Sequence, residues 1–71
     1  MNEDADHIWN QGEFVMSIDN YYGYRINLYL VGKEYYEVFY DPSENEIEKI
    51  NRATKDDLDK YAGRIQLNNL Q

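Results

Sequence analysis

Apolar and polar positions alternate along the middle of the chain, a period typical of β-strands with one wet face. The alternation predicts strands over residues 13–19, 24–31 and 35–40. A fourth strand over residues 46–53 is predicted from hairpin geometry, although its two isoleucines lie three apart, a spacing that suits a helix better. In the first strand, we expect one shared face for Phe14, Met16 and Ile18.

The turn between the second and third predicted strands decides which side chains share a face. A two-residue turn would bring Glu37 opposite Leu28, on the apolar face. A three-residue loop, residues 32–34, pairs Leu28 with Val38 instead. Because a slip of one residue moves every side chain of a strand to the other face, we expect the three-residue loop. Glu37 is then solvated and faces a cross-strand partner such as Arg25 or a lysine.

Two helices are expected to flank the strands. Asn2–Gln11 is predicted as a short helix that docks through Ile8 and Trp9, its only bulky apolar pair, and ends at Gly12. A second helix begins at Thr54, since the stretch Thr54-Lys55-Asp56-Asp57 resembles a capping box. The residues expected on its apolar stripe are Leu58, Tyr61, Ala62 and Ile65, with Leu67 and Leu70 beyond them folding back onto the sheet.

This element order predicts an α+β fold. We expect one domain over residues 1–71, a four-stranded antiparallel β-meander with a short N-terminal helix and a C-terminal helix (α-β-β-β-β-α). Both helices are expected to cover the single apolar face of the meander. The alternative is a small curled barrel, because short strands joined by glycine turns also suit barrels.

Composition limits how so short a chain is stabilised. A chain of 71 residues builds only a modest core, and the absence of cysteine excludes disulfides and thiolate zinc sites. Eight Tyr, two Phe and one Trp make dense aromatic packing the expected substitute, with self-association as a further aid.

The net charge and the hydropathy of the chain limit the classes of partner and the cellular location that we expect. The formal net charge is −7, and residues 1–24 contain five acids and no base. Such a field repels phosphate backbones and anionic membranes, so direct nucleic-acid and membrane binding are disfavoured. Since we find neither a secretory leader nor an apolar run that spans a bilayer, we expect a cytoplasmic protein.

Candidate chemistry is sparse. The lone imidazole, His7, lies on the first predicted helix with no nucleophile predicted beside it. Asp41, Ser43 and Asn45 match the first three ligand positions of a calcium loop, but the sixth and twelfth positions do not fit. We therefore predict no catalytic residue, no metal site, no cofactor and no enzymatic activity.

Three aromatic side chains are expected to form a partner-binding surface. In the predicted register, Tyr29, Tyr35 and Phe39 lie on the sheet face away from both helices, with Val15 and Val31 nearby. Contiguous exposed aromatic patches mark interaction sites. The alternative is that one helix covers each face, or that these are scattered surface tyrosines.

Three classes of function remain open from the sequence. The leading hypothesis is a non-enzymatic protein–protein interaction module, which binds a protein partner or a second copy through the aromatic face or an exposed strand edge. A second is an acidic decoy that inhibits a nucleic-acid-binding protein, suggested by the net charge. A third is an enzyme or small-ligand binder, disfavoured because 71 residues leave little volume for a pocket of about 300 Å³.

The strand residues resemble those of a known group of proteins. The run Tyr36-Glu37-Val38-Phe39-Tyr40, after Leu28-Tyr29-Leu30-Val31-Gly32 and with Ile8-Trp9 on a short helix, is similar to small uncharacterised bacterial proteins over most of the chain. The resemblance rests on strand-packing residues. It implies a bacterial or phage source and transfers no activity and no site.

Overall fold

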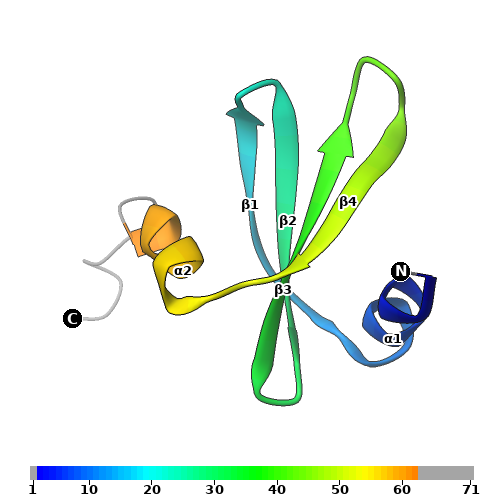
Figure 1. Cartoon of the computed structure of the whole chain (residues 1–71), viewed down its shortest axis with the longest axis vertical. Coiled ribbons are helices and arrows are strands. Elements are labelled where there is room, and N and C mark those ends of the chain that lie inside the picture. The colour runs from blue at the N-terminus through cyan, green and yellow to red at the C-terminus, as the bar shows by residue number, and fades with distance from the viewer. Residues whose placement is uncertain (1, 63–71) are drawn as a thin grey trace.

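The computed structural model describes the backbone of residues 2–62 and the side chains of residues 5–62. Its elements are α1 (Asn2–Gln11), β1 (Glu13–Tyr21), β2 (Tyr24–Val31), β3 (Glu34–Asp41), β4 (Glu46–Arg52) and α2 (Lys55–Ala62). The strands form one antiparallel sheet in the order β1-β2-β3-β4 (Figure 1). The α+β fold and the α-β-β-β-β-α order are confirmed, and the sheet is open because β1 and β4 are not paired.

The two helices pack on opposite faces of the sheet (Figure 1). The face toward α2, called the α2 face below, buries Ile18, Ile26, Leu28, Phe39 and Tyr61. The opposite face, called the α1 face, buries Ile8, Val31 and Val38. The prediction that both helices cover one face is therefore wrong. The physical reason is that β2 and β3 carry apolar side chains on both of their faces, so each face needs a cover.

The turn between β2 and β3 contains two residues, because Val31 pairs with Glu34. Gly32 adopts a φ of 63°, a left-handed conformation that glycine reaches at no steric cost. In this register Leu28 lies opposite Glu37, so the predicted three-residue loop is wrong. This register was expected to be unfavourable because it buries Glu37, and Glu37 is indeed fully buried.

A β-bulge in β1 separates side chains that were expected to share a face. Phe14 pairs with Tyr29 and Met16 with Leu28, so Val15 is the extra residue on β1. The bulge moves Phe14 to the α1 face, while Met16 and Ile18 pack on the α2 face. The prediction of one common face is correct for the last two residues and wrong for Phe14.

A second bulge explains the odd spacing in β4. Ile47 pairs with Tyr40 and Lys49 with Phe39, which leaves Glu48 as the extra residue. Because of this insertion, Ile47 and Ile50 lie on the same face although they are three positions apart. The predicted fourth strand is confirmed, and the bulge explains the helix-like spacing of Ile47 and Ile50.

The helix ends follow the sequence signals. The Asp57 N–H donates to Thr54 Oγ1 at 3.1 Å, and Thr54 N–H donates to Asp57 Oδ2 at 2.8 Å, which confirms the capping box at the start of α2. The predictions for Ile65, Leu67 and Leu70 fall outside the described residues. Within the described part of the chain, neither helix is long and apolar enough to cross a bilayer.

Candidate functional site

The three aromatic residues predicted as a partner site do not share a surface. Phe39 is buried in the α2-face core, where its ring lies 5.9 Å from that of Tyr24. Tyr35 packs against the same core, whereas Tyr29 packs on the α1 face. The structure therefore places Tyr29 on the opposite side of the sheet from Tyr35 and Phe39. The cause is the two-residue turn, and the alternative in which one helix covers each face is the correct one.

A different set of aromatic side chains is exposed and contiguous. The Trp9 ring from α1 lies 5.6 Å from the Tyr29 ring, and the Phe14 ring from β1 lies 5.7 Å from it, both edge-to-face. Trp9 is 50% exposed and Phe14 is 57% exposed, while Tyr29 is half-buried between them. We call these three residues the α1–β1 patch. Its ring contacts join three aromatic side chains, whereas the other ring contacts among the described residues join two.

Local backbone features assemble the α1–β1 patch. Among residues 5–11 of α1, Ile8 is the fully buried side chain, and it fixes this short helix to Val31 and Val38. The Gly12 N–H donates to the Ile8 carbonyl at 2.7 Å, a helical hydrogen bond that closes the last turn of α1. A Cβ at position 12 would lie 2.6 Å from that carbonyl oxygen, so only glycine fits. The bulge at Val15 completes the patch by moving Phe14 beside Tyr29.

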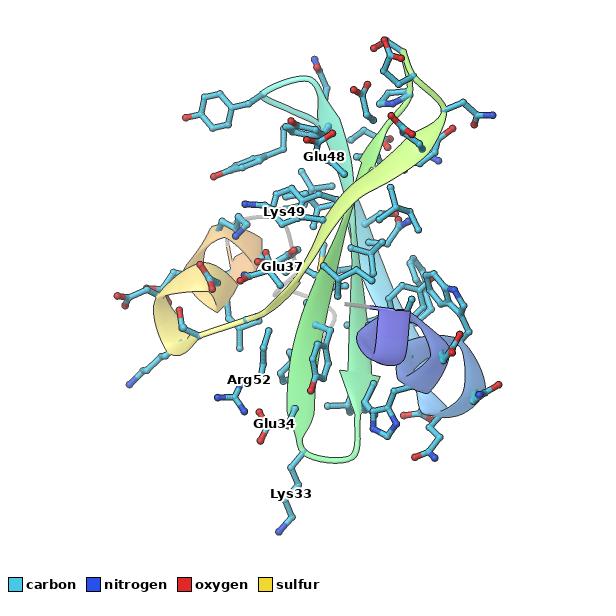
Figure 2. All side chains as sticks on the ribbon, turned by 45° about the vertical axis from the view of Figure 1, so that its right-hand side comes forward. Lys33, Glu34, Glu37, Glu48, Lys49 and Arg52 are labelled. Atoms are coloured by element: carbon cyan, nitrogen blue, oxygen red, sulfur yellow. The ribbon has the colours of Figure 1, made fainter. Side chains whose placement is uncertain are left out.

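The other distinctive site is a buried carboxylate on the α2 face. Glu37 is fully buried, and Figure 2 shows it on the side of β3 that faces α2. Lys60 Nζ lies 2.6 Å from Glu37 Oε2, and the Tyr61 hydroxyl donates to the same oxygen at 2.7 Å. Asn51 Nδ2 donates to Glu37 Oε1 at 3.0 Å. The predicted solvation of Glu37 is wrong, and its lysine partner comes from α2 instead of a neighbouring strand.

This polar network connects α2 to the sheet. Asn51 also donates to Asp57 Oδ2 at 3.3 Å, so β4 is linked to the capping box of α2. The hydrogen bond from the Thr54 backbone, followed by those from the Thr54 and Asn51 side chains, holds the pKa of Asp57 below its usual value. A buried carboxylate is costly unless it is paired. Glu37 therefore favours the position of α2 in which Lys60 and Tyr61 reach its carboxylate.

The network raises the pKa of the Tyr61 phenol well above its usual value of 10.0, through burial first and then through the hydrogen bond to Glu37 and its negative charge. A raised folded-state pKa means that Tyr61 contributes full stability below pH about 10 and loses it as pH rises further, because only the unfolded state then ionises.

We expect Tyr61→Phe to be less stable than the wild type by about 1.5–2 kcal/mol at pH 8, since the hydrogen bond to Glu37 is lost. Between pH 10 and 11 this gap should narrow by about 1 kcal/mol, because the variant lacks the phenol that ionises on unfolding. Urea unfolding of both proteins between pH 8 and 11 measures the gap. A gap that stays constant over this range would show that folding does not raise the pKa of Tyr61.

The remaining polar candidates have structural explanations. His7 is exposed on α1. Asp41 Oδ1 accepts hydrogen bonds from the Ser43 hydroxyl at 2.8 Å and its backbone N–H at 3.0 Å, and the hydroxyl bond is the main cause that lowers the Asp41 pKa. The Tyr40 hydroxyl donates to the Asn45 side chain. These contacts stabilise the β3–β4 turn, and among the described residues no cluster of three potential metal ligands occurs.

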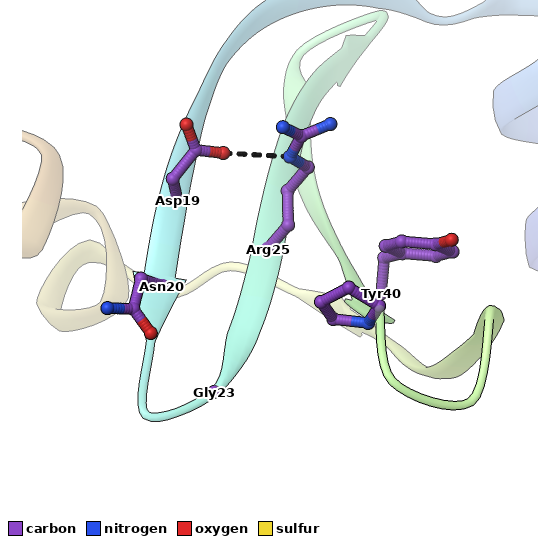
Figure 3. Close-up of a pocket in the computed structure, with 6 residues that line it drawn as sticks. Asp19, Asn20, Gly23, Arg25 and Tyr40 are labelled. Atoms are coloured by element: carbon purple, nitrogen blue, oxygen red, sulfur yellow. Dashed lines mark hydrogen bonds and ion pairs between the residues drawn. The ribbon is translucent and has the colours of Figure 1, made fainter.

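Two hollows accompany these features. One, of about 330 Å³, lies between the ends of the two hairpins and is lined by Asp19, Asn20, Gly23, Arg25, Tyr40 and Pro42 (Figure 3). Its Arg25 Nε donates to Asp19 Oδ1 at 2.8 Å, and both side chains are more than half exposed. A smaller groove, of about 160 Å³, lies along the α2 face and is lined by Val15, Met16, Leu28, Tyr35, Leu58 and Tyr61. Neither contains an unpaired buried polar group that would select a ligand.

Comparisons of the chain with models of protein families, with curated proteins and with solved structures found no match. The function is therefore argued from the chemistry of these surfaces. The resemblance to small bacterial proteins stays a prediction.

Proposed function

We propose that this chain is a non-enzymatic protein-binding module and that it binds its partner through the α1–β1 patch. The observation that carries the proposal is the pair of half-exposed rings, Trp9 and Phe14, each held edge-to-face against Tyr29. Aromatic anchors that are already fixed lose little conformational entropy on binding, and they dominate the energetics of protein interfaces.

The strand edges are poorer candidates for the partner site. β1 contains register shifts on both sides of its centre, and β4 contains one. Bulges twist an edge away from regular pairing, and β4 also presents exposed charges at Glu46, Glu48 and Lys49. Addition of a partner strand is disfavoured at both edges, which leaves the patch as the better surface.

The buried carboxylate supports a structural role more than a catalytic one. Glu37 is enclosed by the Lys60, Tyr61 and Asn51 donors and is closed to solvent. A general acid or base must reach a substrate proton, and this group does not. We therefore propose that Glu37 fixes α2, while the partner binds on the other side of the sheet. The cytoplasmic location also stays part of this proposal.

A pair of matched variants tests the α1–β1 patch. Trp9→Ala combined with Phe14→Ala should lower affinity for a captured partner at least tenfold, because anchor residues at interfaces contribute about 2 kcal/mol or more each. Tyr22→Asn is the control: Tyr22 is 87% exposed on the distant β1–β2 turn, and its φ of 51° suits asparagine.

The immobilised wild type would be used to capture a partner, whose dissociation constant is then measured against all three proteins by calorimetry. Equal affinity for the double variant and the wild type, with both folded, would reject the α1–β1 patch as the binding surface. Light scattering on the same samples shows whether the partner is a second copy of the chain.

A further inference from the structure

The core of the α1 face does not depend on α2. In the described part of the chain, this core consists of Ile8, Val31 and Val38 with partly buried neighbours from the strands. On the opposite face, the residues that α2 adds to the apolar core are Tyr61 and Leu58. If α2 left the sheet, the α1 core would stay intact, and the strand residues of the α2 face would keep their contacts with one another.

The apolar contact between α2 and the sheet is incompletely packed. The groove of about 160 Å³ lies at this junction, with Leu58 and Tyr61 of α2 on one side and strand residues that include Met16, Leu28 and Tyr35 on the other. Atoms beside a gap lose the dispersion contacts that close packing supplies. The groove therefore weakens the apolar attachment of α2, although Tyr61 itself is buried.

The polar part of the same contact fixes one position of α2 without adding much net attachment. Glu37 leaves water completely and Lys60 largely when α2 docks, and the cost of removing two charges from water can equal their attraction in the interior. A small displacement of α2 that separated Lys60 from a still covered Glu37 would leave a buried charge uncompensated. Intermediate positions are therefore unfavourable, and α2 has two favourable states, docked and fully released.

Release of α2 has a natural limit in the backbone. A helix of eight residues is not stable alone, so α2 loses its helical hydrogen bonds when it leaves the sheet. Directly before α2, the Ala53 N–H donates to the Tyr35 carbonyl at 2.8 Å, which continues the pairing of β4 with β3. This hydrogen bond marks the point up to which the chain stays folded in the released state.

We propose that α2 is a lid, a segment that opens as one unit while α1 and the sheet stay folded, and that the Lys60–Glu37 ion pair fixes its closed position. Opening exposes the apolar side chains Met16 and Leu28, so access to this second surface depends on α2. The proposal goes beyond the proposed function and does not rest on it, because the α1–β1 patch lies on the opposite face of the sheet (Figure 1).

Amide hydrogen exchange of the full chain tests the lid with two matched variants. Leu58→Ala and Ile50→Ala each shorten a half-buried side chain, the first on α2 and the second on the α1 face of β4. Leu58→Ala should speed exchange about tenfold in α2 and in β2–β3 alike, because it destabilises the closed state relative to both the open and the unfolded state. Ile50→Ala should speed exchange about tenfold in β2–β3 and leave α2 unchanged, since the open state keeps the sheet. If Ile50→Ala accelerated both regions by the same factor, α2 would open only by global unfolding and the lid would be rejected.

Lys60→Met tests the ion pair, and Lys55→Met, at an exposed position of the same helix, is its control. Lys60→Met should speed the exchange of α2 about 100-fold, while the emission of Trp9 on the opposite face stays that of the wild type. Lys55→Met should change the exchange rates no more than about twofold. Equal exchange rates of α2 in the two variants would overturn the role of the ion pair. A red shift of the Trp9 emission in Lys60→Met, together with faster exchange in α2, would show that the sheet opens with α2 and would overturn the lid.

Discussion

Replacing Lys60 with methionine is expected to lower the free energy of unfolding by about 3 kcal/mol. Methionine keeps the apolar stem but removes the cation 2.6 Å from Glu37 Oε2, and it leaves a fully buried carboxylate with neutral donors only. Removing one partner of a buried ion pair costs about 3–5 kcal/mol of stability. The Lys60 side chain is 18% exposed, so we expect a loss at the lower end of that range. A chain of this length has roughly 4–10 kcal/mol of stability in total, and the variant should be marginal.

A second substitution should restore much of that loss. Glu37→Gln in the Lys60→Met background removes the buried charge. Its one amide oxygen can accept from Asn51, and its amide NH2 group can donate to the Tyr61 hydroxyl oxygen. The double variant should therefore be more stable than Lys60→Met alone, by about 1–2 kcal/mol. Urea unfolding of the wild type, both single variants and the double variant gives the coupling energy. If the loss of unfolding free energy in the double variant equalled the sum of the losses in the two single variants, a buried ion pair between Glu37 and Lys60 would be contradicted.

Ile8→Ala is the variant with the second largest expected effect, a loss of about 2–4 kcal/mol. Ile8 is 1% exposed and is the only buried side chain that attaches α1 to the sheet among the described residues. A helix of ten residues is not stable in isolation, so its undocking should unfold it. Trp9 would then lose its contact with Tyr29, and the emission of this single tryptophan should shift to the red.

Ile47→Ala is the matched control for this experiment. Ile47 is the same residue type on the same face but is 44% exposed, so its loss should cost under about 1 kcal/mol without changing the tryptophan emission. Unfolding curves recorded by fluorescence and by circular dichroism compare the two variants. If Ile8→Ala lowered the free energy of unfolding no more than Ile47→Ala does, the docking of α1 on the sheet would not depend on Ile8.

The strands and helices were predictable from local signals, but the register was not. Alternation, glycine turns and the Thr54 capping box mark the elements, and their bounds agree with the structure within about two residues. The choice between the two turn lengths depended on whether Glu37 was solvated. Its partners Lys60 and Tyr61 lie more than twenty residues away in the sequence. No local pattern reveals that a distant helix will supply a cation to a strand.

The α1–β1 patch was missed for a related reason. A regular β1 strand places Phe14 on the face of Met16, and only the bulge at Val15 moves it beside Tyr29. The signal was present as three consecutive apolar residues, Phe14-Val15-Met16, which a strand with one wet face does not explain. The spacing of Ile47 and Ile50 is the same kind of signal in β4. In short edge strands, a break in alternation is better interpreted as a bulge than as a helix.

The central claim is that each face of the meander has its own helix, so that Tyr29 belongs to an exposed patch and Phe39 to the opposite core. Nuclear Overhauser contacts between assigned aromatic rings of the free protein test it most directly. We expect the Tyr29 ring to show contacts with Trp9 and Phe14, and the Phe39 ring to show contacts with Tyr24. Contacts between Tyr29 and Phe39, together with no contact from Tyr29 to Trp9, would contradict the claim and remove the basis of the binding proposal.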